Sequence, residues 1–198
     1  IERNLILQMG TRDQGIIIEG VVQPVANITI RNNIFATNGT GYAPAVLAGD
    51  GGPVSNLRIV NNTMVAMKGP TEYAIWLFAN DNGVIIKNNG IFEHGNSKVP
   101  YIRVDGAASG LDIGFNSISK SDGLAPAGGA YPNDLWMVDA QFVNLAGQDF
   151  HLKPVSPLIN AGSFLSMVSD DFDGLARPVG AMHDIGAFEF TDLDAGLA

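Results

Sequence analysis

The sequence predicts an all-β fold: a right-handed parallel β-helix, or solenoid, of about five coils followed by a C-terminal capping segment. Three observations lead to this prediction. They are an asparagine-centred repeat, an apolar period of two within each copy, and too little chain between copies for a helix. Residues 1–145 are assigned to the coils and residues 146–198 to the cap and tail.

The repeat is the strongest of these signals. Five segments align on an asparagine at spacings of 29, 29, 27 and 27 residues, and the aligned residues are Asn4, Asn33, Asn62, Asn89 and Asn116. An isoleucine stands three positions before each of them, and two further apolar columns keep the same register. Columns that stay aligned through five copies are typical of repeat architectures.

Each repeat contributes strands and no helix. Apolar residues alternate within each aligned segment, which is typical of a strand with one buried face. A second strand is expected after each asparagine, at residues 15–20, 44–49, 73–79 and 101–106, with 134–140 as a more distant fifth. Two or three strands in 27–29 residues leave no room for a crossover helix. The chain is therefore expected to climb about 4.8 Å per coil and to bury a continuous core between coils.

The asparagine column has a structural explanation. A sharp bend between strands needs a residue that tolerates left-handed backbone, and asparagine does so better than most residues other than glycine. Stacked in register, the side-chain amides can hydrogen-bond along the column. The sequence therefore predicts an asparagine ladder at one bend.

Composition excludes several functional classes. The formal net charge of −9 over 198 residues argues against nucleic acid as a partner and against a basic membrane-surface module. No apolar run approaches the length of a transmembrane segment, and the absence of cysteine excludes disulfides and thiolate metal sites. The sequence starts inside a repeat, which is consistent with further coils of the same parent protein upstream of Ile1.

The register is lost after Asn144, where a second pattern begins. It comprises Asp149, Phe150, Leu152, Ser156, Pro157, Ile159, Asn160, Ala161 and Gly162, then Asp171, Asp173, Gly174, Arg177 and Pro178, then Asp184, Ile185, Gly186, Ala187 and Glu189. The pattern is similar to the C-terminal segment of secreted bacterial β-helix proteins. Residues 149–190 are expected to cover the C-terminal end of the solenoid, where strand edges would otherwise be exposed.

The repeat itself, over about residues 1–145, resembles that of the right-handed β-helix repeat proteins of the pectate lyase-like superfamily. That group includes pectate lyases, alginate and chondroitin lyases and related epimerases. The resemblance implies a bacterial protein that is extracellular, periplasmic or on the cell surface, with a polysaccharide or oligosaccharide as its partner. It implies part of a lyase-like or epimerase-like enzyme acting on acidic glycans. The alternative is a non-catalytic carbohydrate-binding or structural module, because one fold serves several functions.

The candidate site lies on the second-strand column. If the aliphatic residues of 73–79 and 101–106 point inward, the residues between them face solvent. The candidate catalytic residues are Arg103 and Asp105, and the candidate substrate-binding residues are Trp76, Phe78 and Tyr101. Aromatic rings stack on pyranose faces, and arginine pairs with the carboxylates of uronates. The alternative is that a loop such as 121–133 covers the rings and that Arg103 forms an ordinary surface pair with Asp105.

Other chemistry is less well supported by the sequence. A glycoside hydrolase would need two solvent-facing carboxylates, for which Asp105, Glu19 and Asp139 are the candidates. No metal site or cofactor is assigned; Ca²⁺ is kept as a candidate because uronate polymers and the protein are both negatively charged. The histidines show no metal-ligand spacing. His94 is expected to be a solvated loop residue, and His183 is expected to hydrogen-bond locally beside Asp184.

Overall fold

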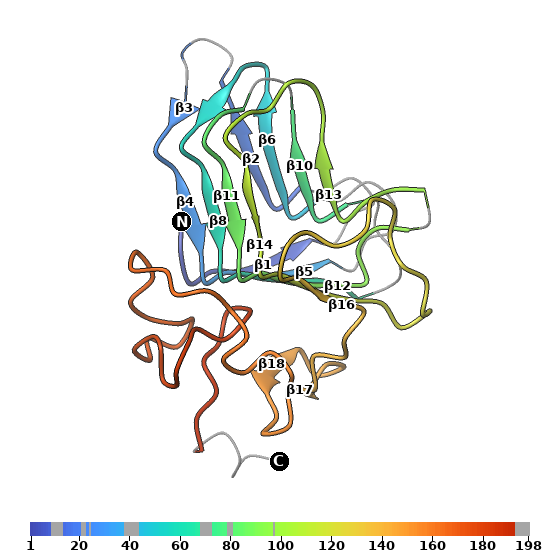
Figure 1. The fold of residues 1–198 in the computed structure, drawn as a ribbon, viewed down its shortest axis with the longest axis vertical. Coiled ribbons are helices and arrows are strands. Elements are labelled where there is room, and N and C mark those ends of the chain that lie inside the picture. The colour runs from blue at the N-terminus through green and yellow to red at the C-terminus, as the bar shows by residue number, and fades with distance from the viewer. Residues whose placement is uncertain are drawn as a thin grey trace.

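The computed structural model confirms a parallel β-helix in which strands from successive coils stack into three sheets (Figure 1). The structure describes residues 1–8, 14–20, 23, 25–37, 44–67, 73–78, 81–96 and 98–192. Within these ranges there is no helix. Ala79 of the predicted strand 73–79 and residues 193–198 of the predicted tail lie outside the described residues.

Each of the three large sheets is a stack of parallel strands from successive coils. The six-stranded sheet contains, in order, β1 (Leu5–Gln8), β5 (Ile34–Thr37), β9 (Thr63–Ala66), β12 (Gly90–Phe92), β15 (Ser117–Ser119) and β16 (Leu135–Trp136). A four-stranded sheet, named the β10 sheet, contains β2 (Ile16–Glu19), β6 (Val46–Asp50), β10 (Ile75–Leu77) and β13 (Ile102–Val104). The other, named the β11 sheet, contains β4 (Thr29–Arg31), β8 (Arg58–Val60), β11 (Ile85–Lys87) and β14 (Asp112–Gly114). A short parallel pair joins β3 (Val25–Ala26) to β7 (Val54–Ser55), and an antiparallel hairpin joins β17 (Phe142–Asn144) to β18 (Asp149–Leu152).

The solenoid makes about three turns, fewer than the five coils expected. Each four-stranded sheet contains three steps from strand to strand, so the part bounded by all three sheets makes about three turns. The expectation counted asparagine repeats, whereas a turn is the interval between two repeats. The coil that contains Asn4 contributes β1 and β2 but no strand to the β11 sheet. The predicted strand at 134–140 also differs, because β16 joins the six-stranded sheet and not the β10 sheet.

The asparagine ladder is confirmed. The backbone nitrogen and Nδ2 of Asn33 both donate to Oδ1 of Asn62, at 3.0 and 3.0 Å. The same pair of bonds runs from Asn62 to Asn89 and from Asn89 to Asn116. At the C-terminal end Asn116 donates instead to Oδ1 of Asp134, at 2.8 and 3.3 Å. A carboxylate can end the ladder because it only accepts hydrogen bonds.

The predicted left-handed backbone of the ladder asparagines is wrong by one position. The left-handed residues precede them, with φ between 52° and 57°, and are Arg3, Asn32, Asn61, Asn88 and Phe115. The preceding residue turns the chain, so the ladder side chain can point inward and bond to backbone carbonyls. A second left-handed column lies at the other end of the β11 sheet and consists of Asn27, Asn56, Gly83 and Gly110.

The tail runs along the sides of the solenoid, and this corrects the expectation that it covers the C-terminal end. Its Leu158, Ile185 and Phe188 pack in one cluster with Val65 and Phe92, which belong to the six-stranded sheet. Figure 1 shows the tail, orange to red, lying below that sheet. The last coil is covered by the segment before β16, where the carbonyl of Pro132 accepts the backbone N–H of Phe115 and Tyr131 packs against the core.

The left-handed asparagines hold the tail in place. Nδ2 of Asn32, Asn61 and Asn88 donates to the backbone carbonyls of Asp170, Asp184 and Ser163, respectively. The order along the tail is not the order of the coils, because Asn88 binds Ser163, Asn32 binds Asp170 and Asn61 binds Asp184. The tail therefore crosses the bends of three coils and then turns back. At each of these bends one outward-facing side-chain amide donates a hydrogen bond to the tail.

Candidate functional site

The candidate site lies on the outer face of the β10 sheet. Ile75, Leu77 and Ile102 are buried in the core, which confirms the predicted inward set of β10 and β13. Trp76 alternates with them and lies directly beside Arg103 on the next strand. Phe78 follows one step further along and stacks on Trp76, with ring centroids 4.2 Å apart. Trp76, Phe78 and Arg103, which the sequence predicted for the site, therefore come together across two coils.

Arg103 is held by three neighbours. Its Nε donates to Oδ1 of Asp105 at 2.9 Å, and its Nη1 donates to the hydroxyl of Tyr73 at 3.0 Å. The guanidinium carbon lies over the Trp76 ring, 4.5 Å from the centroid. Within the described part of the chain, Nη2 has no hydrogen-bond acceptor, and 38% of the side chain is exposed. The guanidinium is thus held by protein contacts at Nε and Nη1, and its Nη2 is open to a ligand.

Asp105 completes this network. Its Oδ2 accepts from Nε1 of Trp76 at 2.8 Å, while its Oδ1 accepts from Arg103. The hydrogen bond from Arg103 lowers the pKa of Asp105, and the same bond raises the pKa of Arg103. Both groups therefore stay charged through the neutral range. The surface pair that the sequence left as an alternative is present, and it forms part of a larger network with two aromatic residues.

Tyr101 does not face solvent, so its predicted orientation is wrong. It is 1% exposed and its hydroxyl donates to Asp134, the residue that ends the ladder. Burial and the Asp134 charge raise its pKa. The alternation was extended one residue too far, because β13 begins at Ile102 and Tyr101 lies in the bend before it. Tyr101 is a core residue and is unable to contact a glycan in this position.

Tyr73 was missed by the sequence argument. Its ring lies 5.2 Å from the Arg103 guanidinium and 5.0 Å from the Trp76 ring. The predicted strand 73–79 gives it the same parity as Ile75 and Leu77, so alternation predicted an inward side chain away from Arg103, whereas β10 begins only at Ile75. Only the spacing of 30 residues between Tyr73 and Arg103, close to the repeat length, connects the two in the sequence.

The tail leaves this face uncovered. It packs on the six-stranded sheet in the cluster described above, and on the outer face of the β11 sheet, where Leu165 and Val168 contact Val60 and Ile85. Figure 1 shows the tail below the six-stranded sheet and away from β2, β6, β10 and β13. Among the described residues, the outer face of the β10 sheet is thus the side that the tail does not occupy.

The carboxylates proposed for a hydrolase are not brought together. Glu19 and Asp105 lie on the same sheet, but β2 and β13 are its two edges. Three strand spacings separate them, roughly 14 Å, whereas glycosidase carboxylates lie about 5–9.5 Å apart. Asp139 lies elsewhere, with Glu93, in a cavity of about 330 Å³ beyond the six-stranded sheet. Asp105 therefore has no carboxylate partner from this set.

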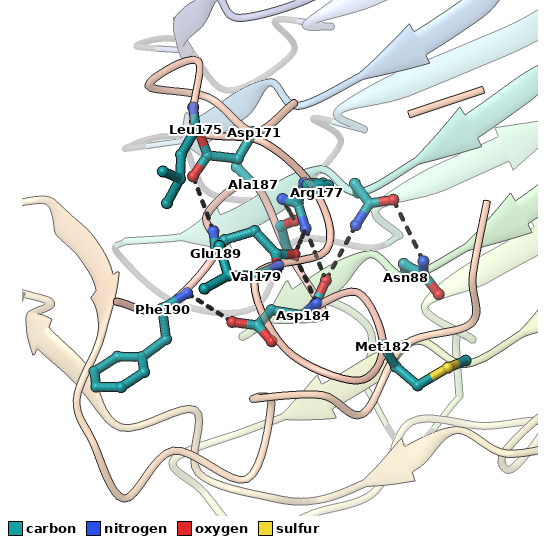
Figure 2. A network of polar contacts seen from close by, with 12 residues as sticks. Asn88, Asp171, Leu175, Arg177, Val179, Met182, Asp184, Ala187, Glu189 and Phe190 are labelled. Atoms are coloured by element: carbon teal, nitrogen blue, oxygen red, sulfur yellow. Dashed lines mark hydrogen bonds and ion pairs between the residues drawn. The ribbon is translucent and has the colours of Figure 1, made fainter. Parts of the chain in front are cut away.

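The charged motif of the tail forms a buried structural network (Figure 2). Arg177 donates to Oε1 of Glu189 at 2.5 Å and to the carbonyls of Asp184 and Gly186. The other oxygen of Glu189 accepts the backbone N–H of Val179. Each of these contacts fixes backbone within the tail. Among the described residues, Arg177 forms its ion pair with Glu189.

The remaining carboxylates of the motif are used in the same way. Asp171 accepts the backbone N–H groups of Asp173, Leu175 and Glu189. Both oxygens of Asp184 accept backbone N–H groups, and burial raises its pKa to about 6. Asp171 and Asp184 thus have a structural role, because their oxygens bind backbone N–H groups of the tail.

Two histidine predictions are wrong. His94 is 1% exposed, and burial lowers its pKa to about 3. His183 is fully buried, neither ring nitrogen has a hydrogen-bond partner among the described residues, and its ring packs edge-on against Phe164. Burial and the nearby Arg177 lower the pKa of His183 to about 4. Both rings are therefore buried and neutral near pH 7.

The described residues contain no group of three or more histidine, cysteine, aspartate or glutamate side chains that could hold a metal ion. The same residues contain no helix long and apolar enough to cross a membrane. No family model, no curated protein and no solved structure matches the chain.

Proposed function

We propose that the chain is a carbohydrate-binding β-helix that holds acidic polysaccharide on the outer face of the β10 sheet. The observation that carries this proposal is the network of Arg103, Asp105, Trp76 and Tyr73. It fixes a guanidinium on a rigid sheet and leaves Nη2 without an acceptor among the described residues. A planar guanidinium pairs with a carboxylate through two parallel N–H groups, which makes uronates its natural carbohydrate ligands.

Aromatic side chains support the same assignment. Phe78 is half-buried and stacks on Trp76, so one ring face is used within the protein and the other is turned away from Trp76. Trp76 is in contact with Phe78, Tyr73 and Arg103, and its role is to position the guanidinium. Phe78 is therefore the better candidate for stacking on a sugar ring.

Binding is favoured over catalysis by the charge states of the site. A general base or acid works best with a pKa near the working pH. The pKa of Arg103 is raised and that of Asp105 is lowered, so neither group exchanges a proton readily at neutral pH. Both oxygens of Asp105 already accept hydrogen bonds from the protein. A lyase or epimerase reaction and a secreted bacterial setting are supported by the resemblance of the repeat alone, so both remain expectations.

The test is a binding titration of uronate oligosaccharides and matched neutral ones. Arg103→Ala is expected to weaken uronate binding about tenfold or more, in line with a charge-assisted hydrogen bond of about 1.5–3 kcal/mol, and to leave neutral binding nearly unchanged. The control is Arg58→Ala, which removes one positive charge from the β11 sheet and leaves the β10 sheet intact. Equal uronate affinities for Arg103→Ala and the unmodified protein would overturn the proposal.

A lyase assay on the same substrates addresses the enzymatic alternative. New unsaturated ends formed by this chain at a rate that Arg103→Ala abolishes would show that the face is catalytic. We expect none. Adding Ca²⁺ during the binding titration tests whether the ion bridges a uronate to the acidic protein, since the chain carries a formal charge of −9.

A further inference from the structure

His151 joins two parts of the tail through both of its ring nitrogens. Nδ1 lies 2.6 Å from Oδ1 of Asp149, which starts β18, and Nε2 lies 2.9 Å from Oδ2 of Asp173. Asp173 is 22 residues further along the chain, in the turn closed by Asp171 and Leu175. The ring also lies against Phe188, with centroids 4.0 Å apart.

The two bonds cannot both exist when the ring is neutral. An ionised carboxylate only accepts hydrogen bonds, so both ring nitrogens must donate, and only the imidazolium form has two N–H groups. Loss of one proton turns one nitrogen into an acceptor that faces a carboxylate. We propose that His151 is a pH-operated latch that fastens the turn at 170–176 to the hairpin β17–β18.

The surroundings of His151 support the charged form. Burial lowers the pKa of His151, hydrogen bonds and charges from Asp173 and Asp149 raise it, and the net result lies above the ordinary 6.5. Phe188 contributes no charge. Glu189, its neighbour, faces Arg177, and Asp171 is occupied by backbone N–H groups. Asp149 and Asp173 are therefore the groups that set the protonation of the latch.

The latch also controls a contact with the first turn of the solenoid. The turn that carries Asp173 begins at Asp170, whose carboxylate pairs with Arg31 at 3.4 Å and Arg3 at 3.8 Å. Opening the turn weakens this attachment. A folded-state pKa above 6.5 means that the stabilisation is fully present below pH 6.5 and is lost as the pH rises through the folded-state value.

Nuclear magnetic resonance of the whole chain tests the latch directly. The ring nitrogens of His151 are expected to show a doubly protonated imidazole with a pKa above 6.5. His94 and His183, with pKa values of about 3 and about 4, do not titrate in this window. Asp184, at about 6, is mostly ionised above pH 6.5. A measured pKa for His151 at or below 6.5 overturns the proposal.

Hydrogen exchange measures the mechanical consequence. After correction for the intrinsic rate, the opening constant of the Leu175 amide should rise up to about tenfold per pH unit above 6.5, then level off. In His151→Gln this rise should disappear. Should that variant not fold, Asp173→Asn keeps an acceptor oxygen without the charge; it should lower the folded-state pKa of His151, so that the rise is smaller and levels off at a lower pH. An opening constant in the unmodified protein that does not change with pH rules the latch out.

Discussion

Replacing Asn62 by leucine removes the central rung of the ladder. The side chain is fully buried and makes five hydrogen bonds: it accepts from the backbone N and from Nδ2 of Asn33, and donates to the carbonyls of Ile30 and Val60 and to Oδ1 of Asn89. Leucine can replace none of them. The substitution leaves φ unaffected, because the left-handed residue of this bend is Asn61.

The magnitude follows from what is left behind. Each lost hydrogen bond contributes about 1 kcal/mol net, and an orphaned buried donor such as the backbone N–H of Asn33 adds about 1–3 kcal/mol. Burying the larger apolar side chain offsets about 1–2 kcal/mol of this loss. Five lost bonds and one orphaned donor, less the gain from burial, give an expected destabilisation of about 4–7 kcal/mol, a large share of the roughly 5–15 kcal/mol that stabilises an ordinary domain.

Urea denaturation followed by circular dichroism gives the free energy of unfolding, and an unchanged m-value shows that the unfolded state is comparable. The matched control is Asn61→Gly at the neighbouring position. Glycine accepts the left-handed backbone, so that variant should lose only the bond to the Asp184 carbonyl and the long bond, 3.4 Å, that Asn61 Oδ1 accepts from Nδ2 of Asn88, about 1–2 kcal/mol together. A smaller loss for Asn62→Leu than for Asn61→Gly would refute our account of the bend.

Three further predictions concern the tail. A chain that ends at Asn144 should aggregate in size-exclusion chromatography, because the apolar outer face of the six-stranded sheet loses its cover; a soluble monomer of unchanged stability would contradict this. Arg177→Met should lower the unfolding free energy by about 3–5 kcal/mol by leaving the buried Glu189 carboxylate without its counter-ion, and Arg177→Met combined with Glu189→Gln, which removes the charge and keeps an acceptor oxygen for the backbone N–H groups, should recover part of that loss in calorimetry. Burial raises the pKa of Asp184 from 3.8 to about 6, so its contribution to the unfolding free energy should fall by up to about 3 kcal/mol as the pH rises between those values. Urea titrations at pH 4 and pH 7 should show a smaller difference in unfolding free energy for Asp184→Asn than for the unmodified protein.

The fold was predictable because the repeat imposes the same requirement on every coil. Ile59 and Ile86 occupy one column in the sequence and one stack in the core, directly paired across β8 and β11. Spacing alone could not show which residue of each bend is left-handed, because Asn61 and Asn62 are chemically identical and either could turn the chain. The path of the tail was equally hidden. The column of Asn32, Asn61 and Asn88 is visible in the repeat, but nothing in the sequence shows that these amides point outward or which tail carbonyl each one binds.

The site was predictable where alternation applies and not where strands end. Trp76 and Arg103 are separated by one coil, so the repeat length predicted their contact, and the register confirms it. Tyr101 and Tyr73 lie in the bends before β13 and β10, where side chains no longer alternate between the two faces of the sheet. One of them turned out to be a core residue, and the other became a partner of the guanidinium.

The three sides of the solenoid can be distinguished by what covers them. The tail buries apolar residues of the six-stranded sheet and reaches the β11 sheet through Leu165 and Val168. A protein that covers two sides with its own chain gains stability there but loses those surfaces for binding. The outer face of the β10 sheet has aromatic rings and a half-exposed ion pair in the same register. The ion pair between Arg103 and Asp105 holds the guanidinium in place before a ligand arrives. This order lowers the entropy cost of binding. This preorganisation is the reason to look for an anionic ligand on that side.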